Sequence, residues 1–456
     1  MTVLNIDDYI KPGRRAHLVG VGGVSMSPLA EVLHGAGMVI TGSDMHDSAT
    51  VEHLRSLGIH VTVGHRAENV AGAELVIRTA AVHDVNPEIA AAREAGIPVF
   101  ERAQAWGSIM KHYRNALCIS GTHGKTTTTS MCTHIIMAAG LDPTVMIGGT
   151  LPLLGAGHRV GRGETIILES CEYCNSFLSF FPTVAVILNI EADHLDFFKD
   201  LEDVERSFRE FASRTPEDGY VVANADDRNT MDTLRGINRK MITFGLGSNA
   251  DVYAENITYL GANSQFDIMY KGEKFTDVTL HVPGVHNVKN ALAATAAAIC
   301  LGIRPNAVKY GLAGFNGAGR RFEFKGKFNG ADVYDDYAHH PGELKALLDT
   351  VEQLNYKRNI LVFQPHTYSR TAALFDDFIK QLRRPNVLLL AEIFAAREKN
   401  TIGISSAALA EKVEGALFFP TFTELETALR RIAQPGDIIL TVGAGDVYKI
   451  GENLTK

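Results

Sequence analysis

The chain has few cysteines, and their spacing builds neither a zinc site nor a disulfide framework. Its 456 residues include five cysteines, of which only Cys171 and Cys174 form a C-x-x-C pair. A complete zinc site of this kind needs a second pair, which the sequence lacks, so a redox or zinc role for the lone pair is only an alternative to ordinary thiols. We expect reduced thiols and a cytoplasmic protein.

Long apolar runs and an excess of positive charge are also absent. No uninterrupted apolar run approaches the roughly 20 residues of a membrane span, so we expect no membrane anchor. The acidic N-terminus has no basic segment followed by an apolar one, so we expect no secretory signal. The formal net charge of -8 argues against a general nucleic-acid-binding protein. A hydrophobic content of 46% indicates a globular chain, long enough for roughly two to four domains.

The most informative stretch is Cys118–Thr129, which reads CISGTHGKTTTT. The apolar residues up to Ile119 predict a buried strand, the glycines that follow predict a turn, and Ser130–Ala139 predicts a helix. Backbone N–H groups at such a helix start bind phosphates. We therefore predict an ATP site at Gly121, Thr122, His123, Gly124, Lys125, Thr126 and Thr127.

Within this loop, Lys125 is expected to reach the β- and γ-phosphates and the Thr126 hydroxyl to bind Mg²⁺. One departure from the full phosphate-loop pattern is Ile119, which stands where that pattern has a glycine. The alternative is an ordinary glycine turn before a threonine-rich helix.

A second glycine-rich turn lies near the N-terminus, in His17–Met26 (HLVGVGGVSM), between a predicted strand and a predicted helix, Pro28–His34. It resembles G-x-G-x-x-G, except that Ser25 replaces the third glycine. Asp44 follows about 20 residues later, where a Rossmann fold places an acid that contacts a ribose. Its alternative role is a turn-forming acid. The pattern fits NAD, FAD or any nucleotide whose pyrophosphate lies on the turn residues Gly20, Gly22, Gly23, Val24 and Ser25.

Two further predicted strands end in acids or histidine. Thr165–Leu168 is followed by Glu169, and Val184–Asn189 is followed shortly by His194. Ligands bind at the carboxyl edge of parallel strands, so we predict Glu169 and His194 as Mg²⁺ ligands together with Thr126. Histidine is an unusual ligand for a hard cation, and capping of the next helix is its alternative role. We predict the glycine-rich stretch 148–163 to be a mobile loop.

The second half of the chain repeats strands followed by polar clusters. An alanine-rich helix within Val282–Ala298 begins with His286, Asn287 and Asn290, which can read adenine or simply cap the helix. Gly314–Glu323 (GFNGAGRRFE) is a glycine-bearing hinge that can deliver an arginine to a phosphate. Val333–Pro341 reads VYDDYAHHP, and the strand Ile360–Phe363 runs into QPHTYSR.

Together these residues resemble the Mur ligase family of peptidoglycan synthesis, over essentially the whole chain. The most specific motifs are GVGGVSMSPLAEVL, GTHGKTTTT, ESCEYCNSFL, NIEADHLD, GRRFE, DDYAHHP, QPHTYSRT and AREKNTIGIS. The resemblance implies a three-domain α/β architecture. Its expected parts are a Rossmann-like UDP-sugar domain (1–110), a central P-loop ATPase domain (111–316) and a Rossmann-like amino-acid domain (317–456).

The resemblance also implies an activity, the ATP-dependent ligation of L-alanine to the lactyl carboxylate of UDP-N-acetylmuramate through an acyl phosphate. ATP and Mg²⁺ are the implied cofactors, and a monomer or weak homodimer is expected. The alternative within the family is a ligase that recycles murein peptides. Two alternatives come from other functional classes. An NAD-dependent dehydrogenase would not use the phosphate loop, and a non-catalytic nucleotide-binding regulator would not need the metal ligands predicted beside it.

Residue roles follow from the same resemblance. Lys125 would offset charge on the phosphoryl group, His194 would hold a second Mg²⁺, and Arg321 would reach ATP. The glycine turn, with Asp44 and Thr79, would bind the UDP-sugar. The amino acid and the developing intermediate would be held by Asp336, His339, His340, His366 and Arg370.

Two departures from the family pattern bear on these roles. Thr367 stands where relatives often have arginine, and the segment 78–82 (RTAAV) stands where many have a serine pair. Sister ligases use a carbamylated lysine, but Ser207–Arg214 contains no lysine, so we predict none.

Overall fold

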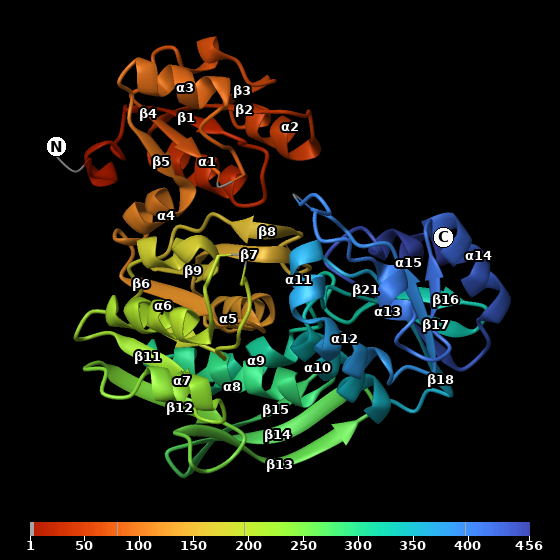
Figure 1. Ribbon diagram of the computed structural model, residues 1–456. Coiled ribbons are helices and arrows are strands. Elements are labelled where there is room, and N and C mark those ends of the chain that lie inside the picture. Colours follow the sequence, from red (N-terminus) through yellow and green to blue (C-terminus); the bar gives the residue numbers. More distant parts are fainter. Residues whose placement is uncertain (1–3, 80, 196, 397) are drawn as a thin grey trace. The chain divides into compact units, whose positions relative to one another are not determined.

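The computed structural model describes residues 4–79, 81–195, 197–396 and 398–456. Three positions in the segments singled out above therefore lie outside the described residues: Ala80, Asp196 and Arg397. The strands belong to three sheets (Figure 1). By its internal contacts the chain divides into two compact units, the first comprising Met1–Glu191, Glu202–Phe244 and Ala293–Gly311, and the second Ala192–Leu201, Gly245–Leu292 and Leu312–Lys456.

The N-terminal sheet has the strand order β3-β2-β1-β4-β5, and all of its strands are parallel. Strand–helix alternation in the sequence produces this arrangement, since parallel neighbours need a crossover between them. Its elements are η1 (Ile6–Asp8), β1 (Arg15–Val19), α1 (Met26–Gly35), β2 (Val39–Asp44), α2 (Ala49–Ser56), β3 (His60–Val63), η2 (Ala67–Val70), β4 (Leu75–Arg78), α3 (Pro87–Glu94), β5 (Val99–Glu101) and α4 (Arg102–Met110).

The larger sheet of the first unit has the order β12-β11-β10-β6-β9-β7-β8. All of its pairs are parallel except the β7–β8 hairpin. The elements of this stretch are β6 (Asn115–Ser120), α5 (Lys125–Ala138), β7 (Thr144–Leu151), β8 (Ala156–Arg159), β9 (Thr165–Glu169), η3 (Tyr173–Ser179), β10 (Val184–Ile187), α6 (Leu201–Ser213), β11 (Tyr220–Asn224), α7 (Arg228–Thr233) and β12 (Lys240–Gly245).

The prediction that residues 148–163 form a mobile loop is wrong, because most of this stretch belongs to the β7–β8 hairpin. Several of its glycines serve close packing rather than flexibility. A Cβ on Gly161 would lie 2.3 Å from the backbone oxygen of Asp142, and one on Gly157 would lie 3.0 Å from the backbone oxygen of Gly149.

An antiparallel stretch that the sequence analysis did not predict follows, with the order β15-β14-β13. Residues 252–313 contain β13 (Val252–Leu260), β14 (Asn263–Tyr270), β15 (Glu273–Leu280), α8 (Val285–Cys300) and α9 (Pro305–Ala313). In the described part of the chain, no helix combines the length and apolarity that crossing a membrane requires.

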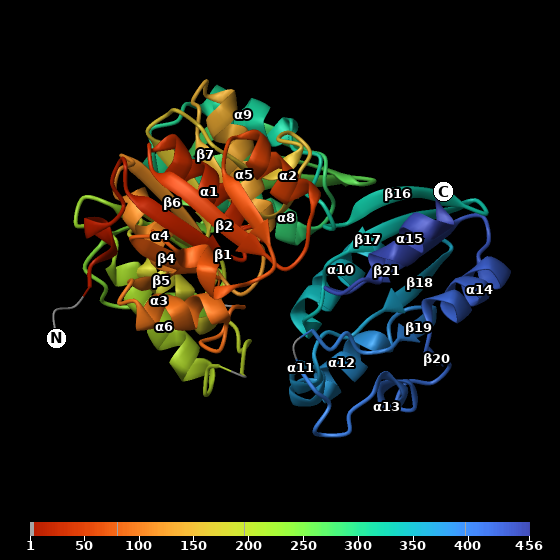
Figure 2. The same cartoon turned by 90° about the horizontal axis from the view of Figure 1, so that it is seen from above.

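The C-terminal sheet has the order β16-β17-β21-β18-β19-β20. Alternate residues of its central strands enter separate apolar layers: Leu361 and Phe363 pack with α10, α12 and α13, and Ile360 and Val362 pack with α14 and α15. Figure 2 shows α15 along β17 and β21. The elements are β16 (Glu323–Phe328), β17 (Ala331–Asp336), α10 (Pro341–Gln353), β18 (Arg358–Phe363), α11 (Tyr368–Ala373), α12 (Phe375–Leu382), β19 (Val387–Ala391), α13 (Ser406–Ala410), β20 (Leu417–Phe419), α14 (Phe422–Ile432), β21 (Asp437–Val442) and α15 (Tyr448–Leu454).

Candidate active site

The phosphate loop joins the carboxyl end of β6 to the start of α5. Gly121 has φ 137°, and a Cβ there would lie 2.8 Å from the Leu188 side chain, so no other residue fits without a shift. Gly124 has φ 85° and precedes the first helical residue, Lys125. The two glycines thus let the chain turn tightly from strand to helix, with the N-terminus of α5 pointing its amides out of the turn.

Asn189, which follows β10, fixes the shape of this loop. Its backbone oxygen accepts from Thr122 N at 3.0 Å, and its side-chain Oδ1 accepts from His123 N at 2.8 Å. Its Nδ2 donates back to His123 O at 3.1 Å. The side chain and the backbone oxygen of Asn189 together bond to three polar backbone groups of the loop, which holds the loop in one conformation.

Lys125 turns its ammonium group back over the loop. Nζ donates to Gly121 O at 2.5 Å and Thr122 O at 3.0 Å, and it lies 3.1 Å from the nearly buried carboxylate of Glu172. Burial alone would lower the pKa of Lys125, but the charge of Glu172 outweighs burial and raises the pKa above its usual range. The lysine is therefore charged at the place where a phosphate would lie.

Thr126 and Glu169 supply oxygen ligands beside this lysine. Thr126 Oγ1 donates to Glu169 Oε1 at 3.0 Å, and Gly148 N of the β7–β8 hairpin donates to Glu169 Oε2 at 2.7 Å. A hydroxyl and a carboxylate on one edge are the hard oxygen donors that Mg²⁺ prefers, so these residues fit that ion. His123 Nε2 lies 3.3 Å from Glu191 Oε2 nearby in the same unit.

The N-terminal glycine turn is assembled as its sequence predicts. Asp44 Oδ2 accepts from Gly22 N at 2.9 Å, and a Cβ on Gly20 would lie 2.9 Å from the Thr79 methyl group. Asp44 therefore braces the turn, which agrees with its alternative role as a turn acid. Val24 and Ser25 complete the turn before α1, and their backbone amides donate to no acceptor among the described residues.

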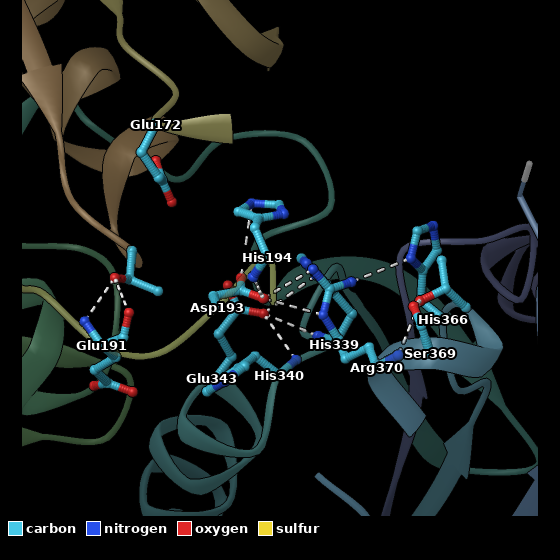
Figure 3. A network of polar contacts seen from close by, with 12 residues as sticks. Glu172, Glu191, Asp193, His194, His339, His340, Glu343, His366, Ser369 and Arg370 are labelled. Atoms are coloured by element: carbon cyan, nitrogen blue, oxygen red, sulfur yellow. Dashed lines mark hydrogen bonds and ion pairs between the residues drawn. The ribbon is translucent and has the colours of Figure 1, made fainter. Parts of the chain in front are cut away.

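In the second unit, Arg370 lies between an acid and a histidine (Figure 3). Its Nη2 is 3.0 Å from Asp193 Oδ1, and its Nη1 is 3.3 Å from His366 Nδ1. Burial would raise the pKa of Asp193, but the Arg370 charge outweighs it and keeps the pKa well below its usual range. Burial lowers the pKa of His366 to about 4, so this imidazole is neutral at pH 7.

His339 and His340 lie at the start of α10, where Glu343 Oε2 accepts from both backbone amides at 2.9 and 3.3 Å. Burial lowers the pKa of His339 to about 4, and its ring centroid is 5.7 Å from that of His366. Because both imidazoles are neutral, they do not repel the charged guanidinium of Arg370. This guanidinium can therefore bind a small carboxylate beside them.

Asp336 ends β17 and accepts from Phe322 N and Ala338 N, both at 2.8 Å. Burial raises its pKa to about 6 despite the nearby charge of Arg321. Arg321 itself lies over the Tyr337 ring, with 5.0 Å from its guanidinium carbon to the ring centroid.

At the start of α8, Asn287 Nδ2 donates to Pro283 O at 2.7 Å and its Oδ1 accepts from Asn290 Nδ2 at 3.2 Å. Burial lowers the pKa of His286 to about 4. Both asparagines are buried, and these bonds hold the turn before the helix. The capping role and the adenine-reading role are thus both compatible with this geometry.

Comparison with known proteins identifies the family. Three family models match in chain order: the Mur ligase family, catalytic domain (residues 15–114), the Mur ligase middle domain (residues 119–298) and the Mur ligase, glutamate ligase domain (residues 320–445). A curated relative from Agathobacter rectalis is 48% identical over 455 residues, which cover 98% of this chain and 99% of the relative. This chain belongs to the Mur ligase family. The expected three-domain α/β fold is thereby confirmed.

Two curated relatives of this Mur ligase carry the same name. The Agathobacter rectalis protein and a Clostridium novyi protein, 44% identical over 96% of each chain, are both called UDP-N-acetylmuramate–L-alanine ligase. A solved UDP-N-acetylmuramate–alanine ligase from Thermotoga maritima is 28% identical with a TM-score of 0.79, covering 96% of this chain and 98% of that one. A murein peptide ligase from Psychrobacter arcticus (23% identical, TM-score 0.71, 97% and 98% covered) shares the fold.

Some of the predicted site residues of this Mur ligase lie in one compact unit, and others belong to the second unit. Lys125, Thr126 and Glu169 lie side by side in the first unit, whereas His194 belongs to the second unit with Arg370. Its role as a metal ligand stays a prediction, as do the three domain boundaries. Thr367 caps α11, since its hydroxyl accepts from Arg370 N at 3.4 Å.

Three residues that contact the predicted site were not assigned roles from the sequence: Glu172, Asn189 and Asp193. Each directly or closely follows the carboxyl end of a buried parallel strand, β9 or β10. That position was the signal that led to Glu169 and His194, and applying it to every polar residue of ESCE and NIEADH would have found them.

Proposed function

We propose that this Mur ligase joins L-alanine to the lactyl carboxylate of UDP-N-acetylmuramate and converts ATP to ADP and phosphate. The observation that carries the proposal is the phosphate loop with charged Lys125 next to the Thr126–Glu169 pair. The names of relatives that are 43–48% identical over nearly the whole chain support the choice of substrates.

In the proposed reaction, a lactyl carboxylate oxygen attacks the γ-phosphorus of ATP, and the bond to the β–γ bridging oxygen breaks. The L-alanine amine then attacks the acyl phosphate carbon, the C–O bond to phosphate breaks, and the amide forms with loss of a proton. Lys125 and the α5 amides would hold the phosphates in line. Mg²⁺ held by Thr126 and Glu169, with His194 for a second ion, would offset negative charge on the phosphoryl group.

The second-unit residues take the roles of amino-acid binding in this proposal. Arg370, next to neutral His366 and His339, is suited to the alanine carboxylate. Asp336 and His340 would complete that face. Arg321 would bind ATP phosphates, His286, Asn287 and Asn290 would contact adenine, and the N-terminal glycine turn with Asp44 and Thr79 would bind the UDP-sugar.

The acceptor is tested by phosphate release from ATP and Mg²⁺ with UDP-N-acetylmuramate, comparing L-alanine with the tripeptide L-Ala-γ-D-Glu-meso-diaminopimelate. We expect release that requires both the UDP-sugar and L-alanine, and a loss of roughly 10²- to 10³-fold in Lys125→Ala. Release with the tripeptide alone would move the protein to peptide recycling. A comparable rate in Lys125→Ala would contradict the phosphate-loop assignment.

A further inference from the structure

Arg102, the first residue of α4, contacts the N-terminal glycine turn. Its Nη1 donates to the Oγ of Ser25, the residue that precedes α1. From the next turn of α4, Trp106 Nε1 donates to the Ser25 backbone oxygen at 3.3 Å. Helix α4 is thus fastened to the end of the glycine turn, and it brings a cation there.

In the described part of the chain this guanidinium makes no ion pair with a carboxylate, although Glu101 interacts with its charge at longer range. Among the described residues its side chain bonds only to Ser25, and the neighbouring Glu101 is taken by Arg78, whose Nε donates to Oε1 at 2.7 Å. Four other arginines of the N-terminal sheet region form ion pairs with acids: Arg14, Arg55, Arg78 and Arg93. Burial lowers the pKa of Arg102 below its usual value, which reflects lost hydration, yet a guanidinium stays charged at neutral pH. A half-buried guanidinium without an ion-pair partner is well suited to an anionic ligand.

Two backbone donors lie at the same place. The amides of Val24 and Ser25 have no acceptor among the described residues, and they precede a ten-residue helix. Amides at a helix start and an arginine fork both match phosphate oxygens. Helix α4 also packs against η3, which shortly follows Glu169 in the chain. The cation is therefore carried by a helix that contacts both the glycine turn and the segment after the predicted metal ligand.

We propose that Arg102 binds the pyrophosphate of the UDP-sugar together with the Val24 and Ser25 amides, which directs the sugar end toward Glu169 and Lys125. This assignment rests on the proposed function, because it takes the glycine turn as the UDP-sugar site. It adds a substrate-binding residue on α4, outside the glycine turn itself.

The test measures binding rather than turnover, by calorimetry on the full-length chain. UDP-N-acetylmuramate, UDP-N-acetylglucosamine, UDP and uridine are titrated into the wild type, Arg102→Ala, Arg102→Lys and the control Arg93→Ala, which changes an exposed arginine of the same region. We expect Arg102→Ala to weaken the three pyrophosphate ligands alike, by roughly 10- to 100-fold, and Arg102→Lys to recover part of the loss. The affinities of the Arg102 variants for uridine and ATP should be unchanged. Arg93→Ala should bind every ligand as tightly as the wild type.

If Arg102→Ala and Arg102→Lys both fold and bind the UDP compounds as tightly as the wild type, the role of Arg102 is overturned. The proposed function is not affected by that result. A loss confined to UDP-N-acetylmuramate would also overturn it, since that ligand differs from UDP-N-acetylglucosamine in carrying the lactyl carboxylate. No binding of any UDP compound by the wild type would overturn the proposed function and this assignment with it.

Discussion

Lys125 is held by two loop carbonyls and by Glu172, so its ammonium group has a fixed place before any phosphate binds. The G-K-T-T sequence was sufficient to predict the lysine, because its neighbours set the strand, turn and helix start. Glu172 was not predictable in the same way, because it lies 47 residues along the chain and reaches Lys125 only through the pairing of β6 with β9. Local motifs reveal the loop, whereas its counter-charge depends on tertiary structure.

Glu88 is a fully buried acid in the N-terminal sheet region. Its Oε2 accepts from Ser43 Oγ at 2.6 Å and lies 3.0 Å from His65 Nδ1, and its Oε1 accepts from Asn69 Nδ2. Burial alone would raise the pKa of Glu88, but His17, Ser43 and Asn69 outweigh it and lower the pKa from 4.5 to about 2. The ionised carboxylate is therefore the form that the folded chain stabilises.

This shift predicts acid sensitivity of the fold. Because the folded pKa is depressed, the stabilisation is present above about pH 4.5 and is lost as the pH falls toward 2. Between pH 7 and pH 3 the free energy of unfolding should fall by about 2 kcal/mol from this group. Urea unfolding of Glu88→Gln should lack that component, whereas Glu94→Gln, at the exposed end of the same helix, should keep it. An unchanged pH dependence in Glu88→Gln would contradict the assignment.

At the scale of elements, the β7–β8 hairpin positions the predicted metal ligand. Gly148 N donates to Glu169 Oε2, and a Cβ on Gly148 would lie 2.7 Å from Glu169 Oε1. The hairpin also reaches α1, since His158 Nε2 lies 2.9 Å from Glu31 Oε1. The glycine at position 148 therefore reflects close approach to a carboxylate, which sequence alone cannot distinguish from a glycine in a flexible loop.

Gly148→Ala should push the Glu169 carboxylate away from Thr126 while the hairpin still forms. We expect the Mg²⁺ concentration for half-maximal phosphate release to rise roughly 10-fold, with the affinity for UDP-N-acetylmuramate unchanged. Gly155→Asn is the matched control, because Gly155 turns the same hairpin with φ 63° and open space around it, and asparagine tolerates that conformation. Equal Mg²⁺ requirements in Gly148→Ala and wild type would show that Glu169 does not hold the ion.

For the whole molecule, strand–helix alternation was enough to predict the parallel sheets, because apolar runs such as Ile360–Phe363 are buried on both faces. The antiparallel strands β13 to β15 were missed, although Phe266 and Ile268 alternate with more exposed residues in the period-two pattern of a strand. These strands pair as hairpins with their sequence neighbours, but they carry none of the polar motifs that marked the other strands. Local sequence patterns also could not predict that His194 belongs to the same unit as Arg370. Residues 192–201 are part of the second unit, whereas the phosphate loop is part of the first.

The central claim, that ATP activates the lactyl carboxylate before L-alanine attacks, has a direct isotopic test. UDP-N-acetylmuramate carrying ¹⁸O in both lactyl carboxylate oxygens is turned over with ATP, Mg²⁺ and L-alanine, and the released phosphate is analysed by mass spectrometry. Because the attacking oxygen leaves with the phosphoryl group, the account predicts one ¹⁸O atom in each phosphate and one in the amide. Amide product accompanied by phosphate free of ¹⁸O would contradict it.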